Sequence, residues 1–193
     1  MINIYRVLIL GGALLVCACS STIPSRRSIP EVGLTLTYSN HWVEVGKERL
    51  TEAYGSYSGP DKQRMPGGDF SSVIFAIANR AYGERTPIIT ISVIPNSKAA
   101  CSIAAETGFV REVAAAEAQR FPGAVFDFGK FSDLKLAHQF QGYLMRLSLQ
   151  DRTVSQYHIF YCQNDDFVRI EGSSSTAAAD SEVERVLSTL VRE

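Results

Sequence analysis

The sequence has little of what marks nucleic-acid-binding proteins and several large enzyme classes. Its formal net charge is −1 at pH 7, with 19 Lys and Arg against 20 Asp and Glu. No block of basic residues stands out, so the chain lacks the electrostatic surface on which nucleic acids bind. It also lacks the H-E-x-x-H zinc motif, the G-x-x-x-x-G-K-[ST] phosphate loop and the G-x-G-x-x-G turn. We therefore expect no nucleic-acid partner.

Histidine is scarce, with three residues, and they form no recognisable catalytic or metal-binding pattern. Pairing the two strands that hold His138 and His158 places His138 opposite a position near residue 165. His138 therefore does not face His158, which argues against a metal ion shared by the two. The glycine-flanked segment at residues 55–59 has Tyr57 at its centre, where a nucleophile elbow needs serine. The sequence therefore predicts no catalytic residue, no metal ligand and no cofactor. An envelope hydrolase with a triad assembled from distant positions stays open as an alternative.

No apolar run is long enough to cross a bilayer as a permanent helix, which takes about 20 residues. The run at residues 7–18 follows the positive charge of Arg6, and its length suits the hydrophobic region of a signal peptide. It ends in the four residues Val16, Cys17, Ala18 and Cys19. This order resembles the lipobox of bacterial lipoproteins. The resemblance implies a signal peptide over residues 1–18 and acylation of Cys19, whereas an ordinary cleaved signal peptide is the alternative.

Lipidation of Cys19 with palmitate-type chains would anchor the protein to a membrane, since each buried methylene contributes roughly 0.8 kcal/mol. By resemblance to Gram-negative sorting rules, Ser20 in place of Asp favours the outer membrane, on its periplasmic side. Residues 19–30 are polar with two prolines and predict a flexible tether. Residues 31–193 then form a single domain held close to the membrane.

Cysteine is also scarce, and the four residues reduce to two in the mature chain. Cys17 leaves with the signal peptide and Cys19 is acylated, so Cys101 and Cys162 remain. Disulfides persist in the oxidising compartments outside the cytoplasm. We predict a structural Cys101–Cys162 bridge, worth roughly 4 kcal/mol in the chain-entropy model. The alternative is two unrelated buried thiols that pack as small apolar groups.

Hydrophobic periodicity predicts an α+β domain. Alternating or β-branched runs predict strands at residues 34–38, 42–45, 70–78, 88–94, 138–150, 153–163 and 167–172. Apolar stripes of helical period predict a long central helix at 102–120, weakened by Gly108, and a C-terminal helix from about residue 180. Short turns make neighbouring strands antiparallel. We therefore expect an antiparallel sheet of six or seven strands flanked by two helices.

The long segment at residues 46–69 is rich in glycine, proline and charge, and it interrupts this pattern. It contains Tyr54, Tyr57, Arg64 and Met65. Aromatic residues, methionine and arginine are enriched at protein interfaces, and loops on a rigid scaffold often carry function. These four residues are our candidate contact surface for a partner protein, and a loop without a role is the alternative.

Three segments together resemble the PsbP-like family, whose bacterial members include DcrB-type lipoproteins. They are LTYSNHW at residues 36–42, IITISVIP at 88–95 and VLSTLV at 186–191. The resemblance implies a sandwich of an antiparallel sheet and helices, and a role as an accessory, interaction or assembly protein. We therefore predict a lipid-anchored envelope module that binds another envelope protein. The main alternative, a carrier or sensor of a small apolar ligand, predicts a pocket between sheet and helix.

Overall fold

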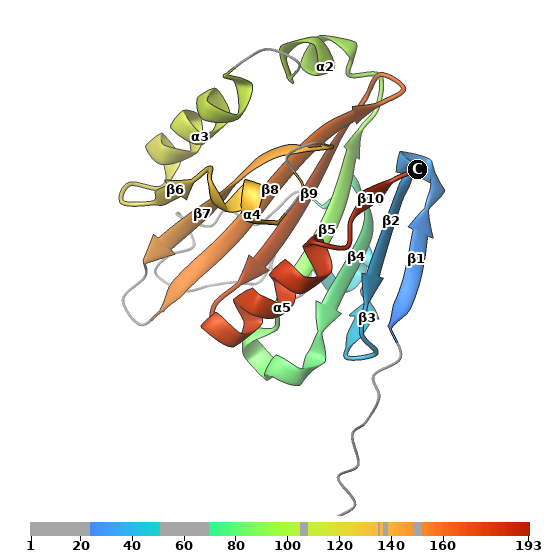
Figure 1. Cartoon of the computed structure of the whole chain (residues 1–193), viewed down its shortest axis with the longest axis vertical. Coiled ribbons are helices and arrows are strands. Elements are labelled where there is room, and N and C mark those ends of the chain that lie inside the picture. The colour runs from blue at the N-terminus through green and yellow to red at the C-terminus, as the bar shows by residue number, and fades with distance from the viewer. Residues whose placement is uncertain (1–23, 51–69, 105–107, 135, 137–138, 149–151) are drawn as a thin grey trace, which may run out of the picture.

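The protein is described here from a computed structural model that covers residues 24–50, 70–104, 108–134, 136, 139–148 and 152–193. Its centre is a seven-stranded antiparallel sheet (Figure 1) with the strand order β3-β4-β5-β9-β8-β7-β6. The strands are β3 (Trp42–Glu44), β4 (Val73–Asn79), β5 (Ile88–Ile94), β6 (Val125–Asp127), β7 (Gln141–Ser148), β8 (Thr153–Gln163) and β9 (Asp166–Ser174). The predicted α+β class with an antiparallel sheet of this size is confirmed.

A second sheet of three strands lies against the first, in the order β1-β2-β10. Its strands are β1 (Ser25–Ile29), β2 (Leu34–Tyr38) and β10 (Val191–Arg192). The prediction of a flexible tether over residues 19–30 therefore fails at residues 25–29. Four of the five β1 residues are exposed, so the strand has no apolar alternation. It forms because the edge of β2 offers unpaired backbone groups.

One face of the large sheet packs against α5 (Ala177–Leu187) and the small sheet, and it holds the main core (Figure 1). Gly172 on β9 makes room for α5, since a Cβ there would lie 2.7 Å from Val183 Cγ1. The buried Tyr157 hydroxyl lies 2.9 Å from Asp180 Oδ1 and 2.7 Å from Glu184 Oε1. Burial and these two carboxylates raise the pKa of Tyr157, so it stays a hydrogen-bond donor that fixes α5 to the sheet.

The opposite face of the large sheet packs against α2 (Lys98–Ala104) and α3 (Phe109–Arg120), and we call it the α2–α3 face. One helix was predicted over residues 102–120, but the structure has two. Gly108 precedes α3 with a φ of 110°, a left-handed conformation that glycine adopts without a Cβ penalty and that interrupts the helical path. α3 ends at Arg120, just before the Pro122-Gly123 pair, as predicted.

Short elements escaped the sequence analysis because two to six residues are too few to show a period. These are β6, β10, α4 (Lys130–Asp133) and the 3-10 helices η1 (Pro30–Val32) and η2 (Arg80–Arg85). α5 begins at Ala177 rather than near residue 180, because the Thr176 side chain caps it by accepting a hydrogen bond from the Ala179 amide. None of the helices in the described ranges combines the length and apolar character needed to span a bilayer.

Candidate functional site

A disulfide fastens α2 to the end of β8. Cys101 on α2 and Cys162 on β8 are bonded, with their Cα atoms 5.8 Å apart and a sequence separation of 61. This is the pairing that the sequence predicted. The bond holds α2 over the last residues of β8, and it thereby fixes one wall of a pocket.

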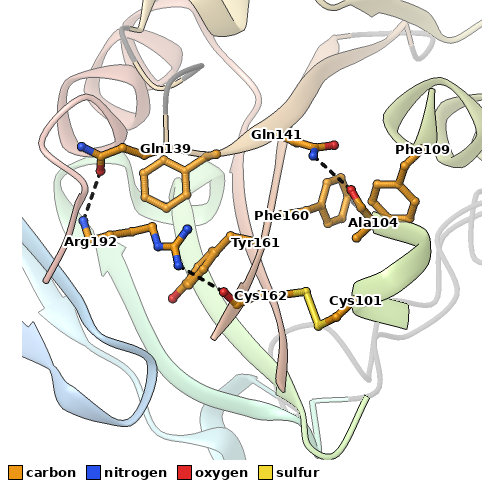
Figure 2. Close-up of a pocket in the computed structure, with 10 residues that line it drawn as sticks. Cys101, Ala104, Phe109, Gln139, Gln141, Phe160, Tyr161, Cys162 and Arg192 are labelled. Atoms are coloured by element: carbon orange, nitrogen blue, oxygen red, sulfur yellow. Dashed lines mark hydrogen bonds between the residues drawn. A yellow bond between two sulfur atoms is a disulfide. The ribbon is translucent and has the colours of Figure 1, made fainter. Parts of the chain in front are cut away.

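The pocket has a volume of about 370 Å³ and lies where α2, the start of α3, the start of β7, the end of β8 and β10 meet (Figure 2). Four of its ten lining residues are aromatic. Phe109 and Phe160 meet edge to face with ring centroids 5.7 Å apart, and Phe140 and Tyr161 do so at 5.4 Å. These rings give the pocket an apolar part, beside a comparable share of polar lining to which Gln139, Gln141 and Arg192 belong.

Arg192 on β10 supplies the one charged side chain among the residues that line this pocket. Its guanidinium lies over the Tyr161 ring, 4.9 Å from the centroid, and reaches the Cys162 carbonyl (Figure 2). Nη2 donates to Cys162 O at 3.2 Å and to Gln163 Oε1 at 3.4 Å. The Arg192 amide donates to Gln139 Oε1 at 3.2 Å. The side chain is therefore held in place from several directions although β10 itself is exposed.

Two further groups set the polar character of the pocket. Gln141 Nε2 donates to the Ala104 carbonyl at 3.0 Å, which ties the end of α2 to the start of β7. The Tyr161 hydroxyl donates to Val32 O at 2.8 Å. Burial raises the pKa of Tyr161, and the charge of Arg192 offsets only part of this rise. Tyr161 therefore faces Arg192 as a neutral ring.

A smaller pocket of about 270 Å³ adjoins the first, and the two share Phe140 and Gln141 in their walls. It lies between α3, α4 and the start of β7, and its other lining residues include Gly108, Phe131 and Gly142. Arg111 is its one charged lining residue, with the guanidinium 4.6 Å from the centroid of the Phe128 ring. Each pocket thus combines several aromatic lining residues with one arginine that stacks on an aromatic ring.

A polar cluster lies on the α2–α3 face of the sheet, beyond Phe160. His158 on β8 is opposite Glu171 on β9, with Nδ1 3.3 Å from Oε1, and Arg169 Nη2 lies 3.4 Å from Glu171 Oε2. Tyr143 stacks on the His158 ring at a centroid distance of 4.8 Å. The His158 Nε2 atom and the Tyr143 hydroxyl are buried and have no hydrogen-bond partner within the described ranges. The hydrogen bond to Glu171 orients His158.

This cluster gives the first testable prediction, which concerns acid stability. Burial alone would raise the pKa of Glu171, but the hydrogen bond from His158 and the charge of Arg169 outweigh it and hold the pKa below the ordinary 4.5. A carboxyl whose pKa is lower in the folded state stabilises it above the unfolded value and loses that contribution as pH falls through the folded value. Glu171→Gln should therefore be less stable than the wild type at pH 7, and the difference should shrink below about pH 4.5.

Urea denaturation at a series of pH values from 7 to 3 measures this difference. Glu31→Gln, which changes an exposed carboxyl on η1, is the matched control. It should follow the wild-type curve throughout. A Glu171→Gln deficit that stays constant down to pH 3 would contradict the assignment.

The structure places only part of the predicted site. Cys101 and Cys162 meet, whereas Cys19 and the predicted contact residues Tyr54, Tyr57, Arg64 and Met65 lie outside the described residues, as does His138. In the part of the chain that is described, no three His, Cys, Asp or Glu side chains gather closely enough to hold a metal ion. Glu171, the partner of His158, was not predicted from the sequence. The tight turn at Asn164 and Asp165 sets a register that would have paired them.

Comparisons with known proteins add a structural likeness. No family model and no curated protein matches the chain. A protein from Bacteroides thetaiotaomicron VPI-5482 is similar over 83% of this chain and 45% of its own, with 10% sequence identity and a TM-score of 0.38. The chain thus spans less than half the length of that protein. PsbP (CyanoP) from Synechocystis sp. PCC 6803 is similar over 88% of this chain and 92% of its own, with 11% identity and a TM-score of 0.40. At these values the similarity carries no functional conclusion.

Proposed function

We propose that this chain is a lipid-anchored protein of the cell envelope whose domain is a non-catalytic binding module. The anchor is supported by the lipobox-like sequence that ends in Cys19. The binding role is supported by one observation above all, the aromatic pocket of about 370 Å³ beneath the disulfide-linked α2. A disulfide also suits an oxidising compartment such as the periplasm.

The pocket favours a small ligand with an apolar part as the bound molecule. The sequence alone put an envelope protein partner first, with Tyr54, Tyr57, Arg64 and Met65 as its contacts. The ligand-carrier alternative requires an apolar pocket between sheet and helix, and the aromatic part of this pocket supports it. Its lining comes from elements of the rigid core, since Phe140, Phe160 and Tyr161 are all buried. A partner protein stays as the second candidate.

The attachment point sets the direction in which the pocket faces. Ser25, the first residue of β1, lies six positions after Cys19, so the link spans at most about 20 Å. Ser25 pairs with Tyr38 at one end of the small sheet, whereas Arg192 pairs with Leu34 at the other end (Figure 1). The pocket beside Arg192 would thus face away from the anchoring membrane. A ligand could enter it from the aqueous phase.

Substitution of the lipidated residue tests the anchor. Cys19→Ser should abolish incorporation of labelled palmitate and leave either uncleaved precursor or protein released from the membrane fraction. Cys17→Ser is the matched control, because it changes a cysteine two residues away at the tolerant position of the lipobox. It should keep both the label and the membrane location. A labelled, cleaved and membrane-bound Cys19→Ser protein would disprove the lipoprotein assignment.

A further inference from the structure

The larger pocket combines two features that together define a class of ligand. Four of its ten lining residues are aromatic, and its one charged lining residue is Arg192. No carboxylate within the described residues forms an ion pair with this guanidinium. An arginine that is oriented, stacked and without an acidic partner, beside aromatic lining residues, is complementary to a ligand that is apolar at one end and anionic at the other.

The hydrogen bonds of Arg192 leave donors available. A guanidinium carries five N–H donors in a planar fork. The interactions with protein acceptors both use Nη2, which faces Cys162 O and Gln163 Oε1. Nε and Nη1 have no acceptor among the described residues. The side chain is thus fixed through one nitrogen, so that little conformational entropy is lost when the others bind a ligand.

The charge of the site favours a carboxylate over a phosphate. A carboxylate has one negative charge and two oxygens, and it accepts two parallel hydrogen bonds from one arginine. A phosphate group carries more charge and more acceptor oxygens, and no second cationic residue lines this pocket. The other arginine nearby, Arg111, belongs to the adjoining pocket and stacks on Phe128.

We propose that the pocket binds a small monocarboxylate with an aromatic or aliphatic body, and that Arg192 recognises its carboxylate. The apolar body lies against Phe109, Phe140 and Phe160. The guanidinium stacks on the ring of Tyr161 in a cation–π contact, which holds it in place. This inference rests on the proposed function, since it names the ligand of the same binding module.

The test uses a matched pair of probes with the full-length lipidated protein in phosphatidylcholine nanodiscs. 4-Phenylbutyrate and 4-phenyl-1-butanol share a phenyl ring and a short chain, and they differ in charge. Isothermal titration calorimetry of each probe, with empty nanodiscs subtracted, gives the dissociation constants. The carboxylate should bind the wild type about 10- to 100-fold more tightly than the alcohol, as expected for a charge-assisted bidentate pair.

Variants at the two arginines locate the carboxylate. Arg192→Gln keeps a hydrogen-bonding side chain without the charge, and it should weaken 4-phenylbutyrate about 10- to 100-fold while the alcohol is unaffected. Arg192→Lys keeps the charge without the fork and should lose part of this affinity. Arg111→Gln is the matched control, an arginine stacked on a ring in the adjoining pocket, and should bind as the wild type.

The outcomes separate the inference from the proposed function. If both probes bind equally well, or if Arg111→Gln and not Arg192→Gln loses affinity, the pocket is a ligand site but Arg192 does not recognise a carboxylate. If neither probe binds up to its solubility limit, the ligand-binding function itself is overturned along with the inference.

Discussion

Removal of the Cys101–Cys162 disulfide is expected to lower the free energy of unfolding by about 4 kcal/mol. The bond joins residues 61 positions apart, so it restricts a long loop of the unfolded chain. Cys101→Ala with Cys162→Ala removes it without adding a polar group. Both cysteines pack with the apolar residues of the α2–α3 face, so the loss of the sulfur atoms adds a smaller packing cost.

Urea denaturation of the wild type and the double variant, each with and without dithiothreitol, measures this effect. The reductant should destabilise the wild type by about as much as the two substitutions do, and it should leave the double variant unchanged. Reduction breaks the bond but keeps both sulfur atoms, so the difference between the reduced wild type and the double variant measures the packing loss alone. A wild type that contains two free thiols in the absence of reductant would refute the bridge.

Loss of the disulfide should loosen α2, which forms one wall of the pocket, because the other contacts of α2 lie at its two ends. The Ser97 amide donates to Asp165 O at 2.8 Å and the Asn96 amide to Asp166 Oδ1 at 2.9 Å, so the segment before α2 stays attached to the turn between β8 and β9. At the far end, α2 is tied by Gln141 to Ala104 O. Between them the disulfide is the one covalent link. Loss of the bridge should therefore speed hydrogen exchange of the α2 amides, including that of Cys101, which bonds to Ser97 O.

The parts of the fold that could be predicted from the sequence are those with a clear local period. β5 alternates over residues 88–94 and β8 is long, so their bounds agree with the prediction. β1 could not be predicted, because its residues 25–28 are exposed and its pairing depends on the edge of β2. The sequence predicted that Gly108 weakens a single helix, but not that the helix is divided in two. Helix propensity gives the free-energy cost of a glycine and does not say whether the chain changes direction there.

The candidate site depends on topology, which explains why most of it was not predicted. The disulfide could be predicted, because the number of cysteines and the compartment leave one pair. The pocket could not, since Phe109, Phe140, Phe160 and Arg192 come from four separate segments that meet only in the folded sheet. Nothing in the sequence around Arg192 distinguishes it from other basic residues near a chain end. The structure distinguishes Arg192 in two ways. Its guanidinium stacks on Tyr161, and no carboxylate within the described ranges forms an ion pair with it.

Substitution of Gly142 by alanine should destabilise the fold by about 3 kcal/mol or more, because the β7–β8 pair has no room for a side chain there. A Cβ at this position would lie 2.2 Å from the backbone oxygen of His158 and 2.5 Å from Phe131 Cε2. The first neighbour belongs to a paired strand and the second to a buried ring of the main core. The His158 oxygen cannot move without the loss of hydrogen bonds, and the Phe131 ring cannot move without the loss of packing. Glycine is therefore needed where the two strands approach closely.

Thermal and urea unfolding of Gly142→Ala measure the loss, and Gly129→Ala is the matched control. A Cβ at Gly129 would lie 3.5 Å from Asp127 Oδ1, an ordinary contact, so this change should be neutral or slightly stabilising. Equal stability of the two variants would mean that β7 and β8 can separate at Gly142 at little cost, and the tight register between them would then be wrong.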